Sequence, residues 1–191
     1  MNLIKPKKLK KGDTIALLSA SGEIRDFDRI KKAEKYFQNS GYKTKISETT
    51  FKKFRYHAGS DEERIAEIEE LFCNKNIDAI VCTRGGYGLL RIVDKLDYDL
   101  IAKNPKIFCG YSDITVLLLM LYKKANLVSF HGAMANGDFG AEKLSQFTEK
   151  SFFETLTTEK PLVFSSKKGK VLNSGSVENA VLWGGCLLYT S

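Results

Sequence analysis

The feature that most constrains the fold is an alternation of short apolar runs with segments of helical periodicity. Each run is rich in aliphatic residues and ends in a turn of small or polar residues. Continuous apolar strands that alternate with helices are typical of a parallel sheet covered on both faces. The sequence therefore predicts an α/β protein. The expected buried strands are 14–19, 79–83, 107–109 and 127–130, and a more exposed strand is expected at 42–47.

Helices are predicted between these strands, because apolar residues recur there at three- and four-residue spacing. Ser60 and Glu63 have the spacing of a capping box, in which each side chain satisfies a backbone N–H of the first helical turn. In chain order, the expected helices are one through Ile30, Ala33 and Phe37 that stops at Gly41, one that begins at the capping box, one through 89–96, one over 114–121, and a polar one over about 141–156.

Four unusual turns follow the predicted strands. Because parallel strands end at the same edge of a sheet, these turns are expected to lie together, where ligands of such sheets usually sit. The coincidence favours a functional site at this edge. The four turns are 19–22, 84–88, 110–113 and 131–134.

Ser112 is the candidate nucleophile. It lies between an apolar strand and an apolar helix, so its hydroxyl is expected at the carboxyl end of the sheet, near the N–H groups of the helix. This layout is typical of an activated-serine hydrolase. Two observations keep another interpretation open: Ser112 and Asp113 are good helix caps, and Ile114 stands where the usual G-x-S-x-G elbow has its second glycine.

The loop Arg84–Gly88 (Arg-Gly-Gly-Tyr-Gly) has three possible uses. It could be a flexible turn, or a phosphate cradle at a helix N-terminus, although its match to G-x-G-x-x-G is incomplete. It could also bring a backbone N–H close to a reacting carbonyl. Paired with the N–H of Asp113, it would then complete an oxyanion hole.

The remaining composition excludes several classes of protein. The histidines are His57 and His131, and neither lies in a segment that supplies an evident base or metal site. The four cysteines are far apart in the sequence, which favours a reduced, cytoplasmic setting. No apolar run is long enough for a membrane span. Lysines 5, 7, 8, 10 and 11 are interpreted as a solvated N-terminal arm rather than a nucleic-acid site.

A series of short motifs, in order and at family spacing, resembles those of the bacterial LD-carboxypeptidases, serine peptidases that include the microcin C immunity proteins. The resemblance covers the whole chain but only about the first two-thirds of that family's architecture. The motifs are Lys11–Ala16, Ser19–Gly22, Gly59–Arg64, Asp78–Ile80, Arg84–Gly88, Arg91, Leu96–Tyr98, Gly110–Thr115 and His131–Met134.

This resemblance implies a flavodoxin-like or Rossmann-like domain whose nucleophile is Ser112. The backbone N–H groups of Asp113 and Gly86 would form the oxyanion hole, and Arg84, Gly85 and Tyr87 would contact the substrate. The implied reaction hydrolyses an L,D peptide bond and releases the terminal D-alanine of cytoplasmic murein tetrapeptides during peptidoglycan recycling. The family uses no metal or cofactor, and homodimers are expected for the full-length protein. No nucleic acid or membrane partner is expected.

The same resemblance suggests how the chain is divided. Residues 1–160 are expected to form the nucleophile domain, 161–170 a linker, and 171–191 the truncated start of a smaller second domain. The family's catalytic glutamate and histidine lie in that second domain, so this chain alone is expected to be inactive. Two departures are Ala133, where the family more often has proline, and Cys186, where it has asparagine. A microcin C immunity-type peptidase and a non-catalytic anion- or nucleotide-binding module remain alternatives.

Overall fold

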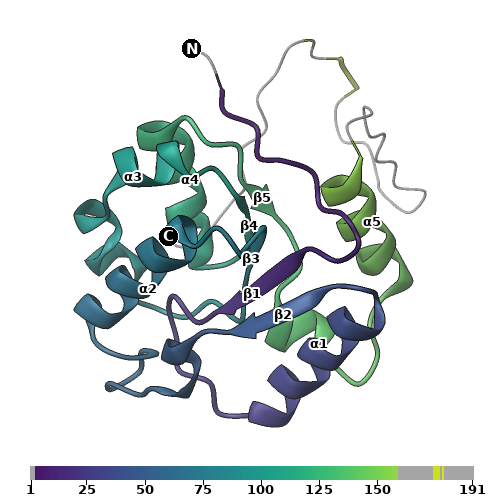
Figure 1. Ribbon diagram of the computed structural model, residues 1–191, viewed down its shortest axis with the longest axis horizontal. Coiled ribbons are helices and arrows are strands. Elements are labelled where there is room, and N and C mark those ends of the chain that lie inside the picture. The colour runs from purple at the N-terminus through teal and green to yellow at the C-terminus, as the bar shows by residue number, and fades with distance from the viewer. Residues whose placement is uncertain (1–2, 159–173, 177, 179–191) are drawn as a thin grey trace.

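The fold is a five-stranded parallel sheet with helices on both faces (Figure 1). The computed structural model describes residues 3–158, 174–176 and 178. The strand order is β2-β1-β3-β4-β5, which is the flavodoxin-like order. The predicted α/β architecture is therefore confirmed. The strands are β1 (Thr14–Leu18), β2 (Lys43–Ile46), β3 (Ala79–Cys82), β4 (Ile107–Gly110) and β5 (Phe130–His131).

Two hydrophobic clusters hold the layers together. Successive residues of β1 point to opposite faces of the sheet: Ile15 and Leu17 join one cluster, while Ala16 and Leu18 join the other. All four are completely buried, which explains why the strand reads as a continuous apolar run. Helices α1 (Phe27–Asn39) and α5 (Gln146–Thr157) cover the first face, and α2 (Asp61–Cys73), α3 (Tyr98–Lys103) and α4 (Ile114–Ala125) cover the second (Figure 1).

The predicted helix through residues 89–96 is wrong. The segment forms two 3₁₀ turns, η2 (Leu89–Arg91) and η3 (Val93–Lys95), and Asp97 then caps α3, which the sequence analysis missed. The apolar residues that suggested a helix are buried all the same. Consecutive 3₁₀ turns can therefore bury the residues that helical spacing was taken to indicate.

Other elements differ from the prediction at their ends. Strand β5 has two residues rather than four, and a π-helix, η4 (Ala135–Phe139), follows it. Helix α5 begins at residue 146 rather than near 141. A 3₁₀ turn, η1 (Glu48–Phe51), follows β2. The capping box of Ser60 and Glu63 is present as predicted.

The N-terminal segment packs against the domain. Ile4 forms a parallel bridge with Leu127, and the N–H of Leu9 donates to the carbonyl of Leu156 (2.8 Å). Leu9 is only 2% exposed. The lysines of this segment are therefore exposed but held in place, which corrects the picture of a solvated arm.

Two further predictions concern the linker with the second domain, and the absence of a membrane-spanning helix. The expected linker, 161–170, and most of the expected second domain, 171–191, lie outside the described residues. Within the described residues, no helix has the length and apolar character that crossing a bilayer requires.

Candidate active site

Ser112 lies at the sharp turn between β4 and α4. Its backbone has φ = +62°, in the left-handed region that residues with a side chain seldom adopt. Such a conformation costs roughly 1–3 kcal/mol and is often found at functional sites. The side chain is exposed, and its hydroxyl makes no hydrogen bond with another described residue. The strand–turn–helix geometry expected of a nucleophile elbow is thus present.

The carboxylate of Asp113 does not cap α4, although Asp113 occupies the N-cap position. It is 2% exposed and accepts hydrogen bonds from the hydroxyl of Ser21 (2.6 Å) and the N–H of Leu89 (3.2 Å). Side-chain capping therefore does not explain why serine and aspartate stand at this turn. Instead, the Asp113 side chain ties together the turns that follow β1, β3 and β4.

The glycine loop Arg84–Gly88 lies directly against Ser112. A Cβ atom added to Gly85 would lie 3.0 Å from Oγ of Ser112 and 3.3 Å from the amide nitrogen of Asp113. A Cβ on Gly86, where φ is +150°, would lie 2.8 Å from the amide nitrogen of Gly22. A Cβ on Gly85 would also lie 2.9 Å from Cβ of Ser112, and contacts below 3.0 Å force a neighbour to shift, so the loop in this position favours glycine at 85 and 86.

Several amides of this site have no hydrogen-bond acceptor among the described residues: those of Gly85, Gly86, Tyr87, Ser112 and Asp113. Backbone N–H groups that are not paired within the protein are suited to bind an anion or a developing oxyanion. The two amides predicted to form an oxyanion hole, Gly86 and Asp113, are among them, and so are three others. Amides of the glycine loop and of the turn at Asp113 are therefore candidates for an oxyanion hole beside Ser112.

Arg64 holds the opposite side of the glycine loop. Its guanidinium is completely buried and donates to the carbonyls of Ala20 (3.1 Å) and Gly88 (3.2 Å) and to Oδ1 of Asp61 (2.6 Å). Burial lowers the pKa of Arg64, while the Asp61 carboxylate acts in the opposite direction. Arg64 therefore anchors the turn after β1 and the end of the glycine loop.

Together, Arg64 and Asp113 form a clamp on two neighbouring segments. Arg64 binds the carbonyls of Ala20 and Gly88, and Asp113 binds donors on the next residues, Ser21 and Leu89. Neither side chain was predicted to have this role. A signal was available for Arg64, because it lies four residues before Ile68 and so on the buried face of α2.

The remaining predicted substrate-binding residues of the loop have different environments. Arg84 is half-buried, and its guanidinium donates to the carbonyls of Gly85 (3.2 Å) and Glu23 (3.0 Å). Its contacts within the protein thus support the loop. Tyr87 is 73% exposed at the rim and remains available for a ligand.

Neither histidine is hydrogen-bonded to Ser112 in the described part of the chain. His57 is half-buried against the glycine loop, and a Cβ on Gly88 would lie 2.5 Å from its Nε2. Burial, and then the charge of Arg64, lower the pKa of His57. His131 is exposed at the end of β5, with its ring 6.3 Å from that of Tyr111. The described residues contain no group of three or more acidic, histidine or cysteine side chains that could hold a metal.

The chain resembles proteins of known family. It is 33% identical to the probable murein peptide carboxypeptidase of Bacillus subtilis over 189 residues. This match covers 98% of this chain and 59% of that protein. Over 157 residues it is 34% identical to the microcin C7 self-immunity protein MccF of Escherichia coli, or 81% of this chain and 46% of that protein. The chain thus spans about half to three-fifths of these relatives.

Solved structures give the same result. An MccF-like protein from Bacillus anthracis superposes with a TM-score of 0.77 and 37% identity, covering 81% of this chain and 47% of that one. A muramoyltetrapeptide carboxypeptidase from Oxalobacter formigenes gives a TM-score of 0.69 and 34% identity, and the match covers 76% of this chain and 48% of that one. Residues 15–132 match the model of the LD-carboxypeptidase N-terminal domain. This chain therefore belongs to the LD-carboxypeptidase family of peptidases.

Proposed function

We propose that the complete protein is a serine-type LD-carboxypeptidase that releases the terminal D-alanine from murein tetrapeptides during peptidoglycan recycling. The observation that carries this proposal is the position of Ser112. Its hydroxyl is exposed at a strained strand–helix turn, against a glycine loop, in a site where several backbone amides have no acceptor among the described residues. The similarity to the Bacillus subtilis murein peptide carboxypeptidase supports this substrate class.

In the proposed reaction, Oγ of Ser112 attacks the carbonyl carbon of the L,D peptide bond. The serine proton passes to a general base and then to the leaving amino group, so D-alanine departs and an acyl-enzyme remains. Water then cleaves the ester and restores the serine. The N–H groups of Gly86 and Asp113 would stabilise the oxyanion of both steps, and losing one such donor typically costs about 3–4 kcal/mol.

A solved relative supports a catalytic serine. The structures of Escherichia coli MccF include an active-site mutant in which a serine, an asparagine and a lysine are each replaced by alanine. We assign the corresponding role in this chain to Ser112, which lies at the exposed elbow. As part of the same proposal, the enzyme acts in the cytoplasm, as a homodimer when full length, without a metal or cofactor.

The 191-residue chain alone should release D-alanine only at a trace rate. Neither His57 nor His131 is hydrogen-bonded to Ser112, and the family's catalytic glutamate and histidine are expected outside this chain. Without a base, the hydroxyl keeps ordinary reactivity, and oxyanion stabilisation alone gives weak acceleration. Incubating the purified chain with a murein tetrapeptide and measuring D-alanine checks this. Rapid release of D-alanine by this chain, abolished by Ser112→Ala, would contradict the prediction that the chain alone is inactive.

Gly85→Ala should lower kcat of the complete protein about 100-fold, because the new methyl group would contact Ser112 at about 3.0 Å and displace its hydroxyl. KM should change much less, since the methyl group points toward the nucleophile. Steady-state kinetics on the tetrapeptide give both constants. Thermal unfolding of the variant serves as the control, and an unaltered kcat in a folded variant would show that the loop does not constrain Ser112.

A microcin immunity-type peptidase is the second candidate, because the chain is 34% identical to MccF over 81% of its length. MccF has been solved in complex with aspartyl sulfamoyl adenosine. Comparing kcat/KM of the complete protein for a murein tetrapeptide and for that aminoacyl nucleotide mimic separates the two functions.

The structure does not favour the third candidate, an anion-binding module at the glycine loop. The loop leads into the three-residue 3₁₀ turn η2, so the α-helix that a phosphate cradle requires does not begin there.

A further inference from the structure

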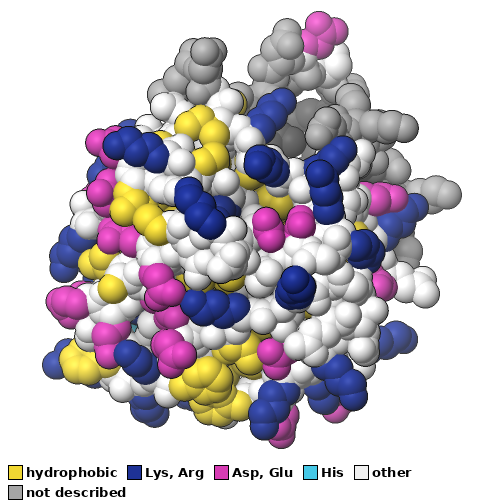
Figure 2. All heavy atoms as spheres, in the orientation of Figure 1, with side chains coloured by type: hydrophobic (Ala, Val, Ile, Leu, Met, Phe, Trp, Pro, Cys, Tyr) yellow, Lys and Arg dark blue, Asp and Glu magenta, His cyan; other side chains and the backbone are white. Residues whose placement is uncertain are grey.

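The N-terminal segment, residues 3–13, packs against the domain and forms one wall of a basic cleft. This cleft lies at the end of the sheet opposite to Ser112. Asp13, Asp78 and Lys106 immediately precede β1, β3 and β4, so the cleft lies beneath the amino-terminal ends of the three central strands. Ser112 follows the carboxyl end of β4 and so belongs to the opposite edge. Figure 2 shows Lys and Arg side chains spread over this side of the molecule, with acidic side chains between them.

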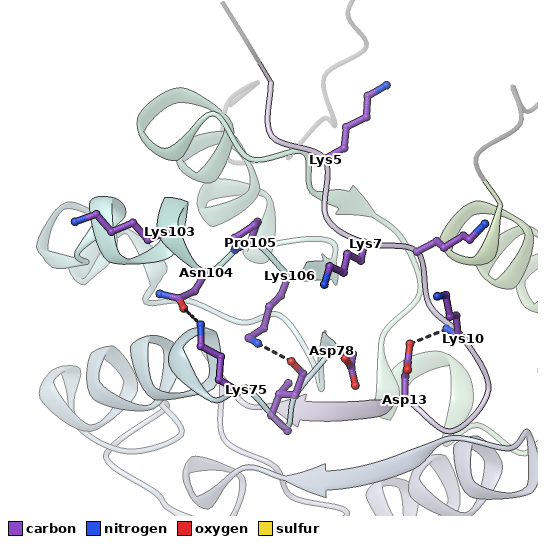
Figure 3. A pocket seen from close by; sticks show the side chains of 12 residues that line it. Lys5, Lys7, Lys10, Asp13, Lys75, Asp78, Lys103, Asn104, Pro105 and Lys106 are labelled. Carbon is purple, nitrogen blue, oxygen red and sulfur yellow. Dashed lines mark hydrogen bonds between the residues drawn. The ribbon is translucent and has the colours of Figure 1, made fainter.

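The cleft has a volume of about 580 Å³ and is lined mainly by lysine. Figure 3 shows Lys7 and Lys106 pointing into the space between the N-terminal segment and the strand ends, while Lys5 and Lys103 point away from it. Three separate parts of the chain supply this lining. The lining lysines are residues 5, 7, 8, 10, 75, 103 and 106, and the lining acids are Asp13 and Asp78.

Both lining carboxylates are already engaged by the backbone. Oδ2 of Asp13 accepts from the N–H of Lys10 (2.7 Å), and Oδ2 of Asp78 accepts from the N–H of Thr14 (2.9 Å). By contrast, Lys7 and Lys10 form no side-chain ion pair with any described residue. With seven lining lysines against two lining carboxylates, the cleft has a local excess of positive charge.

Lys106 gives the cleft a fixed cationic floor. Its side chain is 8% exposed, and Nζ donates to the carbonyls of Asn74 (2.8 Å) and Ile77 (2.5 Å). An ammonium has three N–H donors, so one is left without an acceptor among the described residues. Lys75 closes one side, since its Nζ donates to Oδ1 of Asn104 (2.6 Å). Holding like charges together is unfavourable unless an anion offsets their repulsion.

We propose that this cleft binds a small anion carrying two or more phosphate groups. Lysine ammonium groups recognise phosphate as point charges, and a cleft lined by several lysines favours a multiply charged ligand. The concave shape suits a small molecule. A nucleic-acid surface would interleave aromatic side chains with the lysines, and the lining contains none.

The test uses the 191-residue chain and inorganic triphosphate, with binding measured by isothermal titration calorimetry. The variant Lys7→Gln/Lys10→Gln/Lys75→Gln should weaken binding at least about tenfold. All three side chains are exposed, so the fold should tolerate the changes. The matched control, Lys32→Gln/Lys35→Gln/Lys143→Gln, removes the same charge from exposed positions outside the cleft and should weaken binding less than about twofold.

Two results would overturn the proposal: no measurable binding of triphosphate, or an equal loss in the cleft variant and its control. The second would mean that only overall charge attracts the anion. A parallel titration with ADP distinguishes the sources of phosphate. The same titration is made with pyrophosphate. If ADP binds more tightly than pyrophosphate, and the Lys7→Gln/Lys10→Gln/Lys75→Gln variant loses this binding, the ligand is a nucleotide. If ADP and pyrophosphate bind equally tightly, the cleft recognises the phosphate groups alone.

Discussion

Replacing Ser112 with alanine in the complete protein should lower kcat for D-alanine release by a factor of about 1000 or more. The proposed reaction has no other nucleophile, and removing the nucleophile of a serine peptidase leaves only the acceleration from oxyanion stabilisation and binding. KM should change little, because the exposed hydroxyl contributes mainly to the chemical step. Initial rates over a range of tetrapeptide concentrations give both constants.

The control for this prediction is Ser145→Ala. Ser145 is also exposed and also precedes a helix, α5, without making a side-chain capping bond. It should retain full activity. Both variants should unfold at nearly the wild-type temperature, since neither side chain is bonded within the described structure. Substantial D-alanine release by Ser112→Ala would rule out Ser112 as the nucleophile.

Arg64→Ala should destabilise this chain by about 3–5 kcal/mol, the usual cost of removing one partner from a buried ion pair. The substitution leaves the carbonyls of Ala20 and Gly88 without their donor and Asp61 without its buried partner. For a domain of this size, the unfolding temperature should fall by roughly 10 °C. Denaturant unfolding followed by circular dichroism measures the change in free energy.

Arg91→Ala is the matched control, because Arg91 also pairs with Asp61 (2.9 Å) but has a side chain 59% exposed. An exposed ion pair contributes about 0–1 kcal/mol, so this variant should remain close to wild type. Arg64→Lys should recover only part of the stability, since lysine keeps the charge but loses the planar set of donors. Equal effects of Arg64→Ala and Arg91→Ala would show that the buried clamp does not stabilise the domain.

Most of the sheet could be predicted because its signals are local. β1 and β3 are buried on both faces and therefore read as continuous apolar runs. The capping box at Ser60 follows from three-residue spacing alone. The turns at Ser112 and at the glycine loop were predicted at one edge because parallel strands must end together.

The parts that the sequence did not reveal depend on contacts between distant segments. Helical spacing at 89–96 could not show that the N–H of Leu89 is held by the carboxylate of Asp113, 24 residues away. The orientation of Asp113 depends in turn on Ser21, which is 92 residues distant. Local preference favoured a helix cap at Asp113, and the tertiary hydrogen bonds replaced that role.

The N-terminal segment illustrates the same limit. Its lysines suggested a solvated arm, whereas the buried Leu9 and the bridge from Ile4 to Leu127 hold it against the domain. Nothing in the lysine-rich segment itself indicates that its cations face Lys75 and Lys106. That arrangement depends on which loops lie at the amino-terminal edge of the sheet.

The most direct test of the central claim is to find which atom of the complete protein becomes acylated. The protein would be treated with a fluorophosphonate probe, digested, and analysed by mass spectrometry. Modification of the peptide containing Ser112, lost in Ser112→Ala and prevented by the tetrapeptide substrate, is the result that we predict. Modification at another residue, with Ser112 unlabelled while activity is lost, would contradict the assignment of Ser112 as the nucleophile.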